Sequence, residues 1–165
     1  MPIFRVAAVG LLVVSSASNA QTDPAPPAVP KAEQAKIFAA AGAIKRGKGW
    51  TLCSEDPRSQ GASIEVYRDV NGDSRPEAVV VDGSTFCYGM TGAGYALLTR
   101  DAAGKWTAID DGPGMVDFLK TKGVGGWPDL QVGGPGFCHP VMRWDGKTYK
   151  LNRHEYEGKR CKPQR

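Results

Sequence analysis

Short runs of alternating hydrophobic and polar residues follow one another along most of the chain, and turn-forming residues separate them. From Gly47 onwards, runs of β-branched and aromatic residues are interrupted about every dozen residues by Gly, Pro, Asp or Asn. This spacing is typical of antiparallel β-structure. It predicts strands over residues 50–53, 63–68, 77–81, 95–100, 106–109, 115–119, 129–132, 141–144 and 148–151.

The stretch that precedes these runs has a different period. Over residues 31–41, Ala35, Phe38 and Ala39 recur at a spacing that places side chains on one face of a helix. Gly42 follows, and glycine commonly ends a helix. We therefore predict one amphipathic helix that packs on the sheet through this face.

Two turns are predicted within the strand-rich part. Asp145-Gly146 has the composition of a two-residue hairpin turn, in which both residues adopt positive φ angles. Residues 102–104 form a second predicted turn. The predicted fold class is α+β and mainly β, with one N-terminal helix packed on an antiparallel meander or sandwich of about eight or nine short strands.

The N-terminal part of the chain predicts segments outside the folded domain. Residues 1–20 combine Arg5, an apolar run and a small-residue exit at Ser18-Asn19-Ala20, which is the layout of a secretory signal peptide. The run is too short for a membrane anchor, which needs about 20 apolar residues. Residues 21–30 contain four prolines and predict an extended linker. We expect a single disulfide-clipped β-rich domain over residues 31–165, in the periplasm or secreted.

The four cysteines predict disulfide bonds, because an even number of cysteines in an exported chain normally forms a disulfide framework. Four cysteines allow three connectivities. If the first three predicted strands form one meander, Cys53 and Cys87 lie at the same end of it, and Cys138 and Cys161 flank the last hairpin. This favours the pairs Cys53–Cys87 and Cys138–Cys161. A zinc site is disfavoured because no Cys-x-x-Cys or His-x-x-x-His spacing is present.

The charge distribution argues against a nucleic-acid partner. The formal net charge is only +4. The one basic cluster, at Lys159, Arg160, Lys162 and Arg165, has no interleaved aromatic residues that would stack on bases. We expect a frayed, solvated C-terminal tail, and a monomer.

One loop carries the clearest chemical signal. Asp69, Asn71, Asp73 and Glu77 place oxygen-bearing side chains at positions 1, 3, 5 and 9 of a turn that leads into a predicted strand. Calcium prefers several such oxygens at once. The spacing predicts a calcium site, and the alternative interpretation is an Asx-rich turn without metal.

These residues resemble the D-x-N-x-D-x-x-x-[DE] calcium loops of FG-GAP and VCBS-type β-propeller blades. The resemblance implies that the backbone carbonyl of Arg75 is also a ligand. The usual glycine at the sixth position is replaced by Ser74, which has to adopt a left-handed conformation there. This departure favours weak binding of the extracellular type, with Kd values of about 10⁻⁴–10⁻³ M.

The chain also resembles, over residues 39–161, a group of small exported proteins of Gram-negative bacteria. The segments DVNGDSRPEAVVV, FCYGMTGAGYALL and KGVGGWPDLQVGGPGFC carry this resemblance. It implies one compact domain with one such loop, and it indicates no particular activity. A complete propeller needs several blades, and the chain is too short for one.

No catalytic or cofactor-binding motif is recognisable. Ser84 lacks the G-x-S-x-G context of a hydrolase nucleophile. The glycine-rich stretch over residues 123–136 lacks the Gly-Lys-Ser/Thr ending of a phosphate-binding loop. We expect ordinary loops there, and for Trp127 and Phe137 we favour packing in the core or in the loop over the alternative that they line a pocket.

Two function classes are consistent with these patterns. The first is a periplasmic or secreted binding module that presents loops on a rigid sheet to an envelope protein or polymer. The alternative is a small hydrolase of envelope polymers that uses carboxylates of Asp110, Asp111 and the loop over residues 69–77. The lack of a nucleophile–base signature favours the first. Clustered Asp, Glu and His in a deep cleft would favour the enzyme, and a shallow surface with exposed Trp or Tyr would favour binding.

Overall fold

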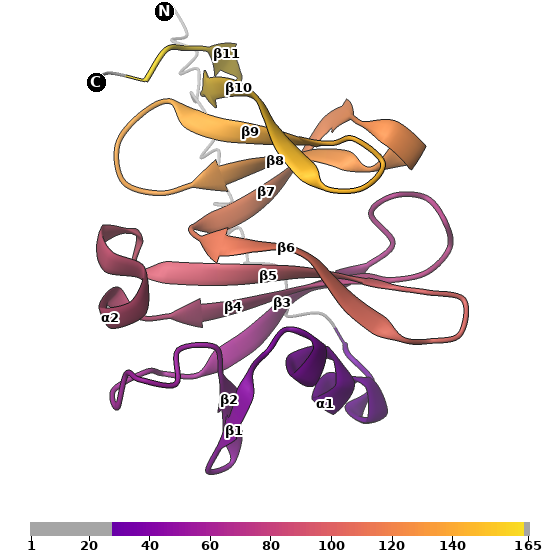
Figure 1. Cartoon of the computed structure of the whole chain (residues 1–165), viewed down its shortest axis with the longest axis vertical. Coiled ribbons are helices and arrows are strands. Elements are labelled where there is room, and N and C mark those ends of the chain that lie inside the picture. The colour runs from indigo at the N-terminus through magenta and orange to yellow at the C-terminus, as the bar shows by residue number, and fades with distance from the viewer. Residues whose placement is uncertain (1–27, 164–165) are drawn as a thin grey trace, which may run out of the picture.

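The chain folds into three layers, a helix and two antiparallel sheets stacked on each other (Figure 1). The structure, a computed structural model, describes residues 28–163. The predicted signal peptide over residues 1–20 and most of the predicted linker over residues 21–30 lie outside the described residues. Within the described part, no helix is long and apolar enough to cross a membrane.

The helical elements are short. They are α1 (Lys31–Ala40), α2 (Thr85–Tyr88) and the 3₁₀ segments η1 (Gly89–Thr91) and η2 (Val124–Gly126). The strands are β1 (Ile44–Arg46), β2 (Gly49–Thr51), β3 (Ala62–Arg68), β4 (Glu77–Gly83), β5 (Ala93–Arg100), β6 (Trp106–Pro113), β7 (Met115–Lys122), β8 (Pro128–Gly133), β9 (His139–Trp144), β10 (Tyr149–Tyr156) and β11 (Lys159–Arg160).

The two large sheets are consecutive meanders. The first has the order β3-β4-β5-β6, and the second has the order β11-β10-β9-β8-β7. The chain passes from one to the other at Gly114, where φ is 124° and an added Cβ would lie 2.6 Å from the carbonyl oxygen of Gly133. Only glycine fits this crossing. The mainly-β prediction is confirmed, and each predicted strand from residue 63 onwards overlaps an observed one.

The strand predicted over residues 50–53 is misplaced. Its first residues belong to β2, which pairs only with β1 in a separate two-stranded ribbon. All three residues of β1 are exposed, so no burial pattern marks this strand in the sequence. The basic C-terminal cluster is also not entirely a frayed tail, because Lys159 and Arg160 form β11 and pair with the end of β10.

Two hydrophobic clusters lie on opposite faces of the first sheet. The cluster between α1 and this sheet contains Ile37, Phe38, Ala43, Ala78, Val80, Ala96, Leu98 and Trp106. The cluster between the two sheets contains Val79, Tyr95, Leu97, Leu130 and Tyr149. Alternate residues of β4 and β5 therefore face different layers, and both strands are covered on both sides. This explains why their sequences are almost continuously apolar.

The helix α1 has nearly the predicted bounds but not the predicted face. Of Ala35, Phe38 and Ala39, only Phe38 is buried, and Ile37 is the other buried residue. Ile37 and Phe38 are the two large apolar side chains of this helix. Burying both removes more apolar surface from water than burying the alanines does.

The connection between β9 and β10 is longer than predicted. It spans residues 145–148, and within it Gly146, with a φ of 101°, is the one residue at positive φ. Asp145 instead accepts hydrogen bonds from the amides of Lys147 and Thr148, both at 2.9 Å, and stabilises the turn through its side chain. The turn predicted over residues 102–104 is present between β5 and β6.

Both disulfides join the favoured pairs, Cys53–Cys87 and Cys138–Cys161. The first pair forms although residues 50–53 are not part of the meander. The segment after β2 runs past the end of β4, where the buried Asp82 carboxylate accepts a hydrogen bond from the Cys53 amide at 3.0 Å. The two bonds indicate an oxidising compartment.

Candidate functional site

The predicted calcium loop is the turn between β3 and β4 (Figure 1). Asp69, Asn71 and Asp73 lie within the turn, and Glu77 is the first residue of β4. The four side chains differ in exposure. Asp69 is exposed, Asp73 is partly buried, and Asn71 and Glu77 are buried. The turn thus runs from solvent into the interior.

Backbone amides hold the outer part of the turn in place. Asp69 accepts hydrogen bonds from the amides of Gly72 at 2.7 Å and Ser74 at 2.8 Å. These donors, Gly72 first, lower the pKa of Asp69 and keep it ionised. Asn71 Oδ1 accepts a hydrogen bond from the Asp73 amide at 2.9 Å. Ser74 has a φ of 66°, which is the left-handed conformation expected at the sixth position.

The inner part of the turn holds a fully buried carboxyl group, that of Glu77. It accepts hydrogen bonds from the Val70 amide at 3.0 Å and the Thr99 hydroxyl at 3.1 Å. The ion pairs among the described residues do not include it. Burial raises the pKa of Glu77, and the negative charges of Asp73 and Asp69 raise it further. Charging this group therefore costs folding free energy.

Two other side chains of the loop contact the carboxylates with N–H groups. The Arg75 guanidinium pairs with Asp73 and donates to the Arg100 carbonyl at 2.9 Å. The Asn71 amide nitrogen lies 3.4 Å from one carboxylate oxygen of Asp73 and of Glu77. With these contacts the oxygens do not converge on one point. In the described part of the chain, no three His, Cys, Asp or Glu side chains are arranged to hold a metal ion.

The chemistry of these donors nevertheless suits calcium. Three carboxylates and one amide within nine residues offer hard oxygen ligands. The buried Glu77 carboxylate is a charge that a bound cation would compensate. Binding requires the Asn71 amide to present its oxygen, and the Arg75 guanidinium competes for Asp73. We therefore expect a weak site.

The loop lies where the two sheets meet. Gly126 of η2, in the connection from β7 to β8, has a φ of 81°, and an added Cβ would lie 2.5 Å from the Asn71 carbonyl oxygen. Just before the loop, the Arg68 guanidinium lies over the Phe118 ring of β7, 5.4 Å from its centroid. The β3–β4 turn therefore contacts the β7–β8 connection, and the end of β3 contacts β7.

The carboxylates considered for a hydrolase are not brought together. Asp110 and Asp111 are consecutive residues of β6, so they point to opposite faces of the sheet. Asp110 accepts a hydrogen bond from the buried Tyr95 hydroxyl at 2.6 Å. Burial raises the pKa of Asp110 above its ordinary value, and the Asp111 charge adds to this. Asp111 lines a pocket on the other face of the sheet.

A second polar cluster, not indicated by the sequence pattern, lies on the second sheet. The buried Asp129 carboxylate accepts two hydrogen bonds from Arg143, both at 2.8 Å, and one each from Arg153 and the Thr121 hydroxyl, both at 2.6 Å. Burial raises the pKa of Asp129, but these donors, Arg143 first, lower it more. Arg153 also pairs with Glu155. Because the charges are mutually paired, we interpret the cluster as structural.

Eight large apolar side chains are exposed among the described residues. Four of them lie on β1, β7, η2 and β10, and the other four lie on segments near the two disulfides. We call these four the exposed apolar patch: Phe86 (64% exposed), Met90 (88%), Phe137 (78%) and Tyr156 (37%). Phe137 packs edge-on against Tyr156, with ring centroids 5.1 Å apart. The loop after β8 adjoins η1, since a Cβ added at Gly134 would lie 3.3 Å from Thr91. Figure 1 shows α2 and this loop on the same side of the molecule.

Each disulfide fixes one phenylalanine of the patch. Phe86 directly precedes Cys87, and Phe137 directly precedes Cys138. The repeated Phe-Cys dipeptide is the sequence signal that marks these two positions. Of the two expected packing modes, core or loop, Trp127 packs against the inter-sheet cluster, and Phe137 is exposed and packs only against Tyr156.

No family model, no curated protein and no solved structure matches the chain. The candidate functional features are therefore the loop over residues 69–77 and the exposed apolar patch. The loop precedes β4 and α2 follows it, so these two features lie at opposite ends of this strand.

The raised pKa of Glu77 predicts how stability depends on pH without metal. Between the ordinary value of 4.5 and the raised value, the folded state binds more protons here than the unfolded state does, so the free energy of unfolding falls as pH rises. In the variant Glu77→Gln, the free energy of unfolding should no longer fall with pH in this range. Urea unfolding in chelating buffer from about pH 4 to about pH 8 measures it.

The exposed Asp117→Asn is the matched control for this measurement, and it should behave as the wild type. An unchanged pH dependence in Glu77→Gln would show that burial does not perturb Glu77.

Proposed function

We propose that the protein is an exported binding module that recognises an envelope protein or polymer through the exposed apolar patch. The observation that carries this proposal is the pair of exposed phenylalanines, Phe86 and Phe137, each held beside a disulfide. Aromatic side chains dominate binding hot spots. Anchors that are already rigid lose little entropy on binding. Contiguous exposed apolar surface marks interaction sites, and Phe137 and Tyr156 form such a surface through their edge contact.

The border of the patch suggests the chemistry of the partner. Arg160 and Lys162 flank Cys161, which is bonded to Cys138 next to Phe137. Both basic residues are exposed. A partner that combines an apolar group with nearby negative charge would complement this surface. Acidic envelope polymers and acidic protein surfaces both have this combination.

Export is supported by two independent features. The pattern over residues 1–20 has the layout of a signal peptide. The two disulfides suit the periplasm or the exterior of the cell, where thiols are oxidised.

We also propose that calcium binds the loop over residues 69–77 and stabilises the fold. The ligands would be the side chains of Asp69, Asn71, Asp73 and Glu77 and the carbonyl of Arg75. When bound, the cation supplies the positive charge that the buried Glu77 carboxylate lacks. Because Gly126 packs on the Asn71 backbone, ordering this turn would also strengthen the contact between the sheets.

The alternative, a hydrolase of envelope polymers, has less support. Asp110 and Asp111 face opposite sides of β6, so they do not form a pair of carboxylates in one cleft. No observation on the described residues favours it over binding.

Calcium should raise the melting temperature of the wild-type protein. At about 100 times Kd, a site present only in the folded state adds about 2.7 kcal/mol. Asp73→Asn should abolish most of the shift. Arg75→Gln should increase it at a given calcium concentration, because the competing guanidinium is gone. Thermal melts at calcium concentrations on the order of 10 mM and in chelator measure both effects.

Magnesium is the control ion for these melts, because it accommodates an irregular oxygen cage poorly. No calcium shift in the wild type, or an equal shift in Asp73→Asn, would show that the loop is a turn without metal.

Phe86→Ala and Phe137→Ala should each weaken binding to isolated bacterial envelopes by about thirtyfold, since truncating a hot-spot aromatic costs on the order of 2 kcal/mol. Ile44→Ala is the matched control, because Ile44 is also exposed (49%) but lies on β1. Co-sedimentation with envelopes measures the binding. The proposal fails if the wild type does not bind, if the double variant binds as the wild type does, or if Ile44→Ala loses binding equally.

A further inference from the structure

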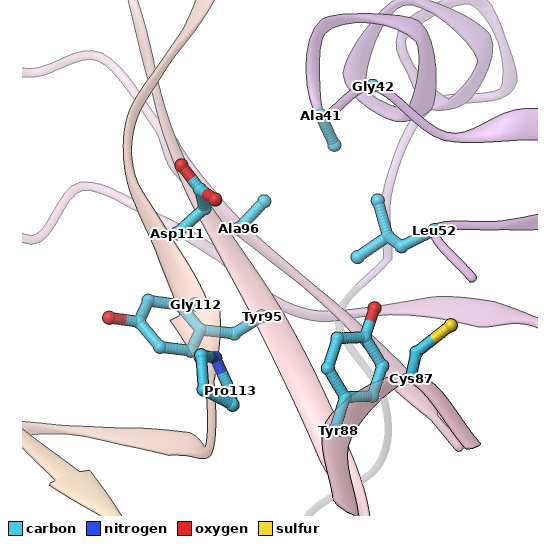
Figure 2. A pocket seen from close by; sticks show the side chains of 10 residues that line it. All are labelled: Ala41, Gly42, Leu52, Cys87, Tyr88, Tyr95, Ala96, Asp111, Gly112 and Pro113. Atoms are coloured by element: carbon cyan, nitrogen blue, oxygen red, sulfur yellow. The ribbon is translucent and has the colours of Figure 1, made fainter. Parts of the chain in front are cut away.

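A pocket of about 390 Å³ lies on the face of the first sheet that carries α1 (Figure 2). It is bounded by the end of α1, the segment after β2, the helix α2, and strands β5 and β6. Its apolar walls include Ala41, Leu52, Ala96 and Pro113. The volume lies within the range of about 300–1,000 Å³ that is usual for small-molecule sites.

Tyr88 forms one polar wall of this pocket. Its ring lies directly on the backbone of Gly94, where an added Cβ would come within 2.1 Å of the ring. Glycine at this position of β5 therefore leaves room for the ring. Figure 2 shows the Tyr88 hydroxyl directed toward the space between Leu52 and Ala96. Burial raises the pKa of Tyr88, and the Asp82 charge adds to this, so the hydroxyl stays neutral.

Asp111 lies on another side of the pocket and is the charged residue of its lining (Figure 2). The ion pairs among the described residues do not include this carboxylate. Its neighbour Asp110 is turned away toward Tyr95, whose hydroxyl donates to it. The carboxylate of Asp111 is therefore available to a ligand.

The C-terminal end of α1 adds to the negative potential. Ala41 and Gly42 line the pocket just after this ten-residue helix. The last carbonyls of a helix carry partial negative charge, which favours a cation nearby. The last turn of α1 contains no basic side chain that would supply one. The carbonyls of Ile37, Phe38 and Ala39 already accept hydrogen bonds from backbone amides after the helix, so the helix end contributes less than Asp111 to the preference for a positively charged ligand.

We propose that this pocket binds an alkylammonium group, a protonated amine on a short apolar chain, either in a free small molecule or in a lysine side chain of a partner. The ammonium group pairs with Asp111 and lies near the carbonyl end of α1. The apolar chain contacts Leu52 and Ala96 and extends toward the Tyr88 ring on the other side of the pocket. The pocket shares α2 with the exposed apolar patch but none of its residues.

The test is a titration of the folded protein with n-hexylammonium chloride, followed through its backbone amide NMR signals. Saturable shifts are expected at Tyr88, Gly94 and Asp111. Hexan-1-ol, which has the same chain without the charge, should bind about tenfold more weakly or worse, as expected when a charge-assisted contact is lost. Hexanoate should not bind.

Asp111→Asn should weaken hexylammonium binding by about three- to fivefold, as expected for an ion pair made by an exposed carboxylate, while Asp117→Asn on β7 makes the same chemical change elsewhere and should have no effect. Blocked lysine, with both backbone ends capped, distinguishes a lysine side chain of a partner from a free small amine as the ligand. Binding as tight as that of hexylammonium assigns the pocket to a lysine side chain, and weaker binding assigns it to free amines.

The proposal is overturned if neither amine gives saturable shifts at the pocket, if hexan-1-ol binds as tightly as the amine, or if Asp111→Asn binds like the wild type. The double variant Phe86→Ala/Phe137→Ala should retain amine binding. The pocket and the exposed apolar patch can therefore fail independently.

Discussion

The burial of β4 and β5 on both faces is the constraint on which the rest of the structure depends. Val79 and Leu97 face the second sheet, while Val80 and Leu98 face α1. Neither face can remain exposed to water, because apolar burial is the main driving force for folding. The molecule therefore needs one further layer on each side of this pair of strands, α1 on one face and the second sheet on the other. The loop over residues 69–77 directly precedes β4, and α2, which carries Phe86 of the exposed apolar patch, directly follows it.

The same burial explains why the loop is energetically sensitive. Glu77 is the first residue of β4 and is buried together with this strand. Its carboxylate has no cationic partner among the described residues. Hydrogen bonds from Val70 and Thr99 offset part of the cost. A proton or a cation would remove more of it. The turn is also where Gly126 of the second sheet's connection packs on Asn71, so changes there reach both sheets.

Features with a local signal were predictable from the sequence, and features made by distant residues were not. The strands after residue 63, the Cys138–Cys161 pair and the left-handed Ser74 follow from alternation, cysteine positions and turn chemistry. The Cys53–Cys87 pair forms for a reason other than the predicted one, because residues 50–53 lie outside the meander. The Asp129 cluster joins residues 14 and 24 positions apart, so no short motif marks it. The pocket beside Tyr88 likewise depends on a ring placed against Gly94 by tertiary packing. The buried face of α1 was predictable only by weighing side-chain size along with periodicity.

Amide hydrogen exchange with and without calcium tests most directly whether a cation bound to the loop over residues 69–77 also stabilises the contact between the two sheets. Amide exchange requires local opening of the structure. A ligand that orders one segment therefore slows exchange in that segment and in every other segment that opens together with it. Calcium is expected to slow exchange over residues 69–77 and also over residues 124–127, which belong to the connection between β7 and β8. No change, or a change confined to residues 69–77, would contradict the account.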